Sequence, residues 1–335
     1  MIELEEFINK RYGKQVILNN LSFKVLRYEI AILLGSNRVG KTAALNIIAG
    51  IISPDHGRVT IDNRVVFEKR GSRILVNTPP EYRYVSYVPQ DYAFSPHLTV
   101  YEYENVAFGL RARNFSESDI KRRVKELIDF IGLNGIENKY PHQLSSGEKQ
   151  KVALARALAP EPRVILLDEP LSSIDPGSKE YIRWELREFP KKLKITILIV
   201  THNLNDAWAL ADRIMVMLRG NIICSGSPDD ILSRIKSKEA ARFLGLNALE
   251  GTVISKNGSD ITIYSREANI KLIAKDKSNN INKGDKVLVL FRLDDITIHS
   301  KEDNIEAVNS IEAKILGVQV TKCNIKCLYN YPRTA

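Results

Sequence analysis

The chain has 335 residues and a mass of 37.9 kDa, which is enough for about two domains with cores of their own. Hydrophobic residues make up 44% and charged residues 27% of it, a balance that is typical of a folded globular protein and excludes wholesale disorder. The net charge is +9, but the basic residues are spread along the chain. The charge therefore gives little support to nucleic-acid binding.

No segment predicts a membrane span or a secretion signal. The longest apolar stretches, such as residues 195–200, are far below the roughly 18 residues that a spanning helix needs. Residues 1–6 have neither the basic nor the apolar region of a signal peptide. The three cysteines at 224, 323 and 327 form no Cys-x-x-Cys pair, which favours reduced thiols over disulfides or a zinc site. We expect the protein to stay in the cytoplasm.

The pattern of the chain changes near residue 240. Before that point, short apolar strands alternate with helical stretches, which predicts an α/β protein. The expected strands are apolar at consecutive positions, as in a sheet covered on both faces, and include residues 30–34, 164–167 and 195–200. Each is followed by a polar or glycine-rich segment, and open α/β sheets bind ligands at the carboxyl ends of their strands.

A mostly helical insert is expected between residues about 92 and 160. Within it, Ser116 and Asp119 form a capping box for a helix that continues to Ile131.

Residues after about 247 show short strands separated by turn signals, which predicts a small β barrel or sandwich. Asn257-Gly258 is a hairpin signal, and residues 282–285 mark another turn. The expected strands are residues 252–255, 261–264, 270–274, 287–291 and 296–299.

Residues 35–42, Gly-Ser-Asn-Arg-Val-Gly-Lys-Thr, lie between an apolar strand and a helical pattern. This is a Walker A P-loop in its required strand-loop-helix context. Its backbone amides cradle phosphates, Lys41 reaches the β and γ phosphates, and Thr42 offers a hydroxyl to Mg²⁺. The residues expected to bind nucleotide here are Gly35, Ser36, Asn37, Arg38, Val39, Gly40, Lys41, Thr42 and Ala43.

A second half of the nucleotide site follows the apolar strand at residues 164–167, which ends in Asp168 and Glu169. Asp168 fits the Mg²⁺-binding aspartate of a Walker B strand. Glu169 is placed to orient the attacking water and accept its proton. An acidic turn alone would mean little, but beside a P-loop it predicts ATP hydrolysis.

Leu144-Ser145-Ser146-Gly147-Glu148 opens a helix that continues to Ala159 and precedes Asp168. This segment resembles the Leu-Ser-Gly-Gly-Gln signature of the ABC ATPases. The resemblance implies that Ser145 and Gly147 present a helix N-terminus to the γ-phosphate on the other subunit's P-loop.

Four further residues fall in the order of the ABC family. Tyr12 resembles the aromatic residue that stacks on adenine, and Gln90 resembles the Q-loop glutamine that binds Mg²⁺ and senses the γ-phosphate. Asp175 lies in a segment similar to the D-loop, and His202 resembles the histidine that holds the γ-phosphate. The agreement in order carries more weight than any one residue.

The rest of the chain resembles the importers of this family. Residues 92–110 are similar to the segment that receives a permease's coupling helix, and residues 243–251 and 291–296 are similar to a TOBE domain. The implied fold is an α/β P-loop NTPase with a RecA-like core and a helical subdomain, followed by an all-β, OB-like TOBE domain. We expect a nucleotide-binding domain at 1–235 and a TOBE domain at 247–335.

The resemblance implies an ATPase that binds ATP and Mg²⁺, pairs head to tail with a second copy, and docks on integral membrane permease subunits. It would lie at the cytoplasmic face of the cell membrane as a peripheral subunit, act indirectly with an external solute-binding protein, and bind no nucleic acid. The entry to the TOBE region, Asn-Ala-Leu-Glu-Gly, resembles molybdate and tungstate importers, while sugar, iron and polyamine systems use similar appendages.

Three residues depart from the family pattern. Arg38 stands at a usual P-loop glycine, Ser146 at the first signature glycine and Glu148 at the signature glutamine. A backbone with positive φ at any of them would cost energy, and slower hydrolysis is expected in that case. A regulatory homologue without hydrolysis, and a soluble ABC ATPase acting on nucleic acid or ribosomes, are the alternatives.

Overall fold

A computed structural model describes residues 1–95, 97–100, 105–276, 280–291, 308–309, 314–320 and 325–330. The contacts divide the chain into two units, Met1–Arg234 and Ile235–Ala335, which we describe separately. Among the described residues, no helix is long and apolar enough to cross a membrane.

The first unit contains a five-stranded antiparallel sheet. Its strands are β1 (Ile2–Tyr12), β2 (Gln15–Val25), β4 (His56–Ile61), β5 (Arg64–Arg70) and β6 (Arg73–Asn77). Their order is β2-β1-β4-β5-β6. Tyr12 pairs with Gln15, and Gly13 makes the intervening turn with a φ of 58°, which glycine adopts without strain. Tyr12 is therefore the last residue of a strand, beside the expected turn.

The second sheet of this unit has six strands in the order β11-β10-β3-β9-β8-β7. They are β3 (Ile30–Leu34), β7 (Val85–Val88), β8 (Val164–Asp168), β9 (Thr196–Thr201), β10 (Arg213–Leu218) and β11 (Asn221–Gly226). All neighbours are parallel except β10 and β11. The three predicted strands are present and buried at every position, although β9 begins and ends one residue later than expected.

Because β3, β8 and β9 are parallel neighbours, their carboxyl ends lie at one edge of the sheet. The segments that follow them, which begin at Gly35, Glu169 and His202, are thereby brought together.

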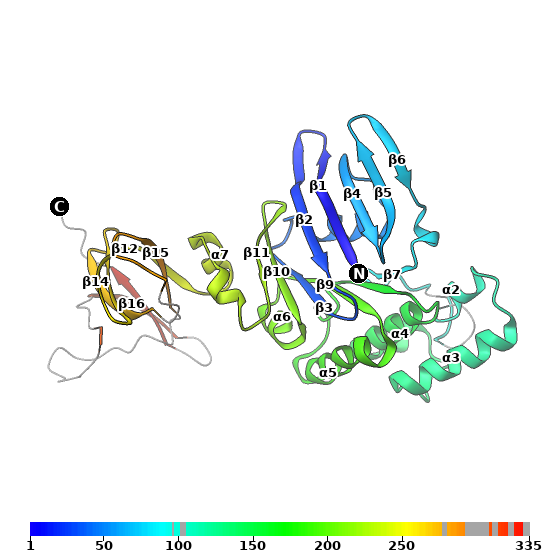
Figure 1. Cartoon of the computed structure of the whole chain (residues 1–335). Coiled ribbons are helices and arrows are strands. Elements are labelled where there is room, and N and C mark those ends of the chain that lie inside the picture. Colours follow the sequence, from blue (N-terminus) through cyan, green and yellow to red (C-terminus); the bar gives the residue numbers. More distant parts are fainter. Residues whose placement is uncertain are drawn as a thin grey trace. The chain divides into compact units, whose positions relative to one another are not determined.

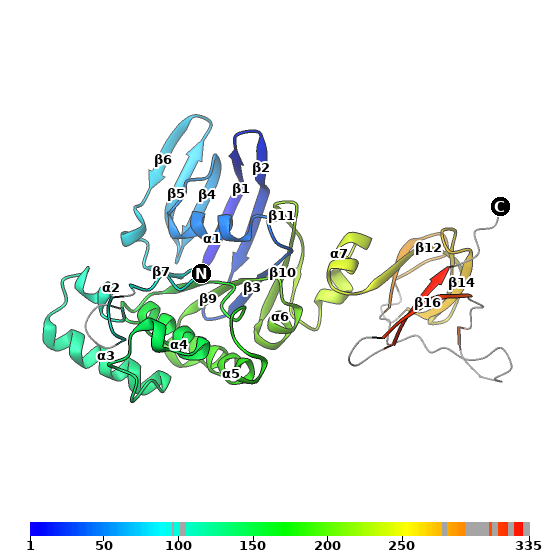
Figure 2. The same cartoon turned by 180° about the vertical axis from the view of Figure 1, so that it is seen from behind.

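Helix α1 (Lys41–Ala49) lies against both sheets (Figure 2). Its Ala44, Leu45, Ile47 and Ile48 belong to one core with apolar residues of both sheets, such as Leu4 and Leu198. Burial of that apolar surface is the main force that holds the two sheets together. The helix starts two residues before the apolar pattern at Ala43 indicated.

Helices α4 (Ser146–Leu158) and α5 (Pro176–Leu193) cover the other face of the six-stranded sheet, as Figure 1 shows. Ser116 accepts a hydrogen bond from the Asp119 amide and starts α3 (Glu117–Ile131), and Gly132 ends it with a φ of 70°. This confirms the predicted helix. The remaining helical segments are η1 (Pro80–Tyr82), α2 (Phe108–Arg111), η2 (Pro141–Gln143), α6 (Leu204–Leu210) and η3 (Ile231–Arg234).

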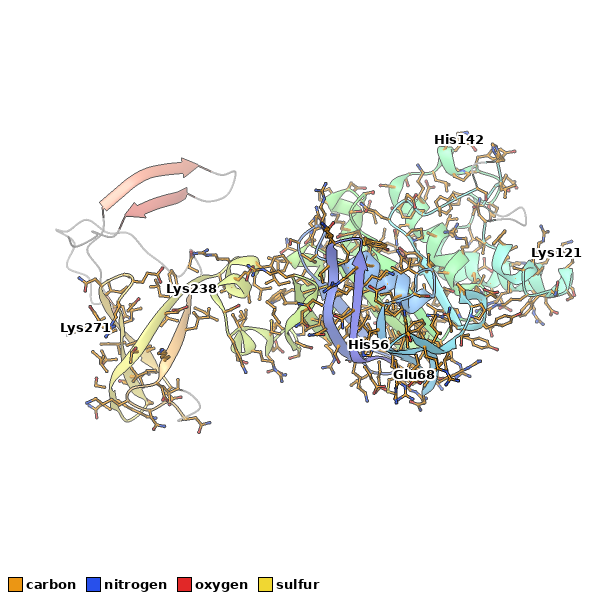
Figure 3. All side chains as sticks on the ribbon, turned by 90° about the horizontal axis from the view of Figure 1, so that it is seen from above. His56, Glu68, Lys121, His142, Lys238 and Lys271 are labelled. Carbon is orange, nitrogen blue, oxygen red and sulfur yellow. The ribbon has the colours of Figure 1, made fainter. Side chains whose placement is uncertain are left out.

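The helical insert lies at one end of this unit. In Figure 3, Lys121 of α3 and His142 of η2 are at that end, away from His56 and Glu68 of the antiparallel sheet. The insert is therefore joined to the core near β7 and β8 rather than to the antiparallel sheet.

The second unit starts with α7 (Lys238–Phe243) and contains a four-stranded antiparallel sheet in the order β14-β13-β12-β15. Its strands are β12 (Asn247–Asn257), β13 (Asp260–Ser265), β14 (Ile270–Lys275) and β15 (Lys286–Phe291). β16 (Lys314–Val320) and β17 (Ile325–Asn330) form a further hairpin. Four of the five expected strands lie within these elements; residues 296–299 are outside the described residues.

The predicted Asn-Gly hairpin of this sheet is also present. Asn257 pairs with Asp260 across a two-residue turn, in which Gly258 has a φ of 63°, as the Asn-Gly signal indicated. Lys256 joins the end of β14 to the next turn, because its Nζ is 3.0 Å from Asp276 Oδ2 and donates to the Ile281 carbonyl at 2.8 Å.

Candidate nucleotide site

The loop between β3 and α1 requires glycine at both of its ends. A Cβ on Gly35 would lie 2.8 Å from the Met217 carbonyl oxygen, and one on Gly40 would lie 2.8 Å from the Ile17 carbonyl oxygen. Gly40 has a φ of 106° and no side chain caps α1. The amides of the first turn of α1 are therefore left to bind an anion.

Lys41 is folded back into the loop. Its Nζ donates to the Gly35 carbonyl at 2.8 Å and the Ser36 carbonyl at 3.0 Å, and it lies 3.6 Å from Glu169 Oε1. The side chain is buried, and burial lowers the pKa of Lys41, although the nearby Glu169 and Asp168 carboxylates oppose this. A buried cation with carboxylate and carbonyl partners is poised to exchange them for phosphate oxygens.

Asp168, the last residue of β8, is held by two hydroxyl groups. Tyr87 Oη donates to Asp168 Oδ2 at 3.2 Å, and the Thr42 side chain hydrogen-bonds the same carboxylate. Burial raises the pKa of Asp168, and the two hydrogen bonds oppose that shift. The predicted pair of Thr42 and Asp168 is thus brought together, with oxygen ligands of the kind that Mg²⁺ prefers.

Glu169 is in contact with three side chains at the edge of the sheet. Its Oε1 is 2.9 Å from His202 Nδ1 and 3.6 Å from Lys41 Nζ, and its Oε2 accepts from Thr201 Oγ1 at 3.2 Å. Because a carboxylate only accepts, His202 Nδ1 carries the proton in this pair. The three predicted residues Lys41, Glu169 and His202 therefore converge.

The backbone at Glu169 is unusual. Its φ of 49° is in the left-handed region that disfavours residues with a Cβ, at a cost of about 1–3 kcal/mol. The conformation is fixed by the Glu169 amide, which donates to the Val200 carbonyl at 2.9 Å. It directs the chain away from β8 immediately after Asp168.

Sequence reasoning missed Tyr87 and Thr201 as parts of this site. Tyr87 lies in β7, beside β8, and burial raises its pKa further from neutrality, so it stays a donor. Neither residue belongs to a motif, and only the strand order reveals their contacts. The one available signal for Thr201 is its place at the carboxyl end of an apolar strand.

Five other predicted residues lie outside this cluster. Tyr12 is exposed at the end of β1, where the Lys10 ammonium is 5.4 Å from its ring centroid. Gln90 is exposed after β7 and, with Ser146, lines a separate cavity of about 410 Å³. Asp175 caps α5 by accepting from the Ser178 amide at 2.9 Å. Ser145 and Gly147 lie at the start of α4.

The signature segment starts α4 with a capping box. Ser145 Oγ accepts from the Glu148 amide at 3.2 Å, and Glu148 Oε2 accepts from the Ser145 amide at 2.7 Å. Lys139 Nζ is 3.2 Å from Glu148 Oε1. Glu148 therefore has a structural role in place of the signature glutamine. Within the described residues, no hydrogen bond or ion pair connects residues 144–150 to the P-loop of the same chain.

Of the three departures from the family pattern, only Arg38 has a positive φ, at 66°. Ser146 and Glu148 are the first and third residues of α4, where the backbone is helical. The expected backbone cost applies to Arg38 alone.

Four features together define the ABC class of ATPases: a P-loop after one strand of a parallel sheet, an Asp-Glu pair at the end of another strand of that sheet, a helical insert and an antiparallel sheet. The family pattern described as ABC transporter matches residues 18–172. The chain is 37% identical to the molybdate/tungstate import ATP-binding protein WtpC of Pyrococcus abyssi over 94% of this chain and 85% of that protein. It is 34% identical to the spermidine/putrescine import ATP-binding protein PotA of Clostridium acetobutylicum, over 84% and 82% respectively.

Among solved structures, the ABC transporter cassette MJ0796 in its dimeric form has a TM-score of 0.58 and 29% identity, and covers 68% of this chain and 99% of that chain. CbiO1 of Clostridium perfringens, part of the ABC transporter complex cbiONQ, has a TM-score of 0.60 and 29% identity, over 72% and 92%. The chain belongs to the import ATP-binding subunits of ABC transporters, and it is an ATPase.

Proposed function

We propose that this chain hydrolyses ATP as a head-to-tail pair of identical subunits and drives the import of an oxyanion such as molybdate or tungstate. The observation that carries the ATPase half of the proposal is the contact of Glu169 with both Lys41 and His202 at the mouth of the P-loop. The solute half rests on the similarity to the import ATP-binding proteins WtpC.

The P-loop residues 35–43 would hold the phosphates through their amides, with Lys41 at the β and γ phosphates. Lys41 must then leave the carbonyls of Gly35 and Ser36, to which it donates now. Phosphate oxygens would replace these two carbonyls as acceptors, so the number of hydrogen bonds is kept. The charge attraction to the Lys41 ammonium would be larger. This exchange makes Lys41 a ligand that responds to bound nucleotide.

Glu169 would accept the proton of the attacking water, and His202 would hold the γ-phosphate. The Nδ1 proton of His202 is engaged by Glu169, which fixes the orientation of the ring. Phosphate oxygens only accept, so Nε2 would hold the γ-phosphate when the ring also carries a proton there. The Thr201 hydroxyl restrains the other carboxylate oxygen. A carboxylate fixed in this way needs little reorganisation to orient water, which is the source of electrostatic catalysis.

Mg²⁺, when bound, would neutralise charge on the phosphates. Thr42 and Asp168 fit this role because their side chains already meet, and the carboxylate is kept in place by Tyr87. Gln90 would join them only after moving from the cavity that it lines. Its proposed sensing role is consistent with such a movement.

The second copy would supply Ser145 and Gly147 to each nucleotide, with Asp175 near the same contact and Tyr12 on the adenine. Two observations support this. The amides at the start of α4 form a helix N-terminus that suits an anion, and within one chain they form no bond to the P-loop among the described residues. MJ0796, a similar cassette, is a dimer.

The surface around Phe94 would dock on the permease. The Phe94 and Tyr92 rings are stacked with centroids 5.6 Å apart, and the Arg156 guanidinium lies 5.3 Å from the Phe94 centroid. Arg156 also donates to the Ala93 carbonyl at 2.8 Å and to the Tyr92 carbonyl. This packed aromatic wall borders the cavity of about 410 Å³, a shape that fits a helix from a partner.

A permease partner would place the chain at the cytoplasmic face of the cell membrane as a peripheral subunit, with an external solute-binding protein on the opposite face. The second unit would be the accessory TOBE domain at 247–335, following the nucleotide-binding domain at 1–235. All of the proposed catalytic residues lie in the first unit.

An oxyanion is favoured as the solute because three WtpC proteins, among them those of Pyrococcus abyssi and Pyrococcus horikoshii, are 37–41% identical to this chain. The polyamine relatives named PotA are 34–35% identical. Polyamine import is therefore the second candidate, and its solute would be a cation rather than an anion.

The test is to purify the chain with its membrane partners, reconstitute the complex in vesicles with its binding protein, and measure ATP hydrolysis with each solute. We expect molybdate or tungstate to stimulate hydrolysis and spermidine to have no effect. Stimulation by spermidine alone would replace the oxyanion by a polyamine as the proposed solute. Purification without any membrane partner would contradict an importer.

The Phe94→Asp variant tests the docking surface. It should lose stimulation and membrane association while its soluble ATPase rate stays within about threefold of wild type, since Phe94 is not among the contacts of Lys41, Glu169 and His202.

A further inference from the structure

A second cavity, of about 530 Å³, lies directly beside the P-loop and has three arginines in its wall. Arg38 comes from the P-loop, Arg11 from β1 and Arg219 from the turn between β10 and β11. The remaining lining residues are uncharged: Val16, Ile17, Asn19, Val39 and Gly220. Among the described residues, the wall thus carries three positive charges and no carboxylate.

The three arginines are brought together by the fold. The amide of Asn19 in β2 donates to the Gly220 carbonyl at 3.0 Å, which holds the β10–β11 turn against β2. A Cβ on Gly220 would lie 2.4 Å from the Ile17 carbonyl oxygen, so the close approach requires glycine. Arg219 is therefore held on this wall by the turn that it belongs to.

Arg38 is placed at a backbone position that suits glycine. Its φ is 66°, a left-handed conformation that a residue with a Cβ avoids. Its side chain is exposed, and among the described residues no carboxylate forms an ion pair with it. A strained position with an unpaired cation in a binding loop indicates a function of the side chain rather than of the backbone.

We propose that the guanidinium of Arg38, supported by Arg11 and Arg219, binds the phosphate chain of a nucleoside di- or triphosphate. Arg38 and Val39 belong both to the P-loop and to this cavity, so the arginines would extend the phosphate site into it. Guanidinium groups bind phosphate oxygens through paired hydrogen bonds. This inference rests on the proposed nucleotide site and adds a binding element to it.

The added affinity should depend on the number of phosphates. A hydrogen bond to a charged group contributes enough to change affinity by about tenfold or more. We therefore expect Arg38→Asn to weaken ATP binding by about tenfold, ADP binding by less, and adenosine binding by less than twofold. Asparagine tolerates the left-handed backbone, so this variant removes the charge without adding strain. Arg38→Lys should retain part of the affinity, because it keeps the charge but not the paired hydrogen bonds.

The measurement is calorimetric titration of the full chain with ATP, ADP and adenosine at two salt concentrations. Raised salt should reduce the difference between wild type and Arg38→Asn, because exposed charges are screened. Arg219→Asn should weaken ATP binding in the same direction. Arg73→Asn, an exposed arginine on β6, is the matched control and should change nothing.

Two results would overturn the inference: unchanged ATP affinity in Arg38→Asn, or an equal loss of ATP and adenosine affinity, which would mean that the cavity binds the base. Thermal unfolding without nucleotide shows whether each variant is folded, and Arg38→Gly should unfold no lower than wild type since its backbone is relaxed. Lys41→Ala in the same titration separates the two proposals. If Lys41→Ala loses ATP while Arg38→Asn does not, the nucleotide site stands and the arginine inference fails.

Discussion

Replacement of Glu169 by glutamine is the sharpest chemical perturbation of this site. Glutamine keeps the shape of the side chain and can still accept from Thr201, whose Oγ1 is 3.2 Å from Glu169 Oε2. It cannot accept the proton of an attacking water. Loss of a general base costs about 10² to 10⁴ in rate, so we expect hydrolysis to fall by at least about 100-fold.

The same change removes the carboxylate that faces Lys41 at 3.6 Å. Because the Glu169 charge raises the pKa of Lys41 against the larger effect of burial, its loss lowers that pKa further in the nucleotide-free protein. The buried pair is lost, but Lys41 keeps two carbonyl partners. We therefore expect the nucleotide-free variant to lose roughly 1–3 kcal/mol of unfolding free energy. ATP restores an anion beside Lys41, so ATP binding should be retained.

Three measurements check this prediction: single-turnover phosphate release, ATP titration, and size-exclusion chromatography in Mg-ATP, where a stable dimer should accumulate. Glu188→Gln is the matched control. Glu188 lies on α5 and pairs with Lys192 at 3.5 Å, and it is not among the partners of Glu169. The reasoning is refuted if Glu169→Gln hydrolyses ATP within about threefold of wild type, or if it no longer binds ATP.

Three further predictions concern stability, the second subunit and the C-terminal unit. Burial raises the pKa of Asp168 above its ordinary 3.8, so the folded protein binds this proton more tightly than the unfolded one. The unfolding free energy then falls as pH rises from 3.8 through the raised pKa of Asp168. In thermal unfolding measured against pH, Asp168→Asn should lack this fall. A variant with the pH profile of wild type would contradict the prediction. Ser145→Arg should impair hydrolysis but leave ATP affinity within about twofold, and an equal loss of affinity would exclude action on the other subunit's nucleotide. Deletion of residues 247–335 should preserve basal hydrolysis, and a folded but inactive truncated protein would disprove a separate N-terminal motor.

Much of the first unit could be predicted because its signals are local. The apolar runs of β3 and β8 favour strands of a covered sheet, and Gly35 and Gly40 belong to one continuous motif, residues 35–42. Ser116 begins α3 through a side chain that lies next to it in sequence. Each of these depends on a few consecutive residues.

What could not be predicted depends on which strands become neighbours. The contact of Tyr87 with Asp168 arises because β7 pairs with β8, and that of Thr201 with Glu169 because β9 follows β8 in the sheet. The left-handed backbone at Glu169 is equally invisible in sequence. The capping role of Glu148 has a local signal, because Ser-x-x-Glu is a helix-start pattern, and here that pattern coincides with the segment that resembles the signature motif.

The most direct test of the account is phosphate release from Mg-ATP by the purified full chain and by Lys41→Ala, measured side by side. Lys41 is the cation buried in the P-loop, and it contacts the Glu169 carboxylate. We predict steady hydrolysis by wild type and a rate at background for Lys41→Ala, together with the loss of ATP binding in titration. Normal binding and hydrolysis of Mg-ATP by Lys41→Ala would contradict the assignment of the nucleotide site.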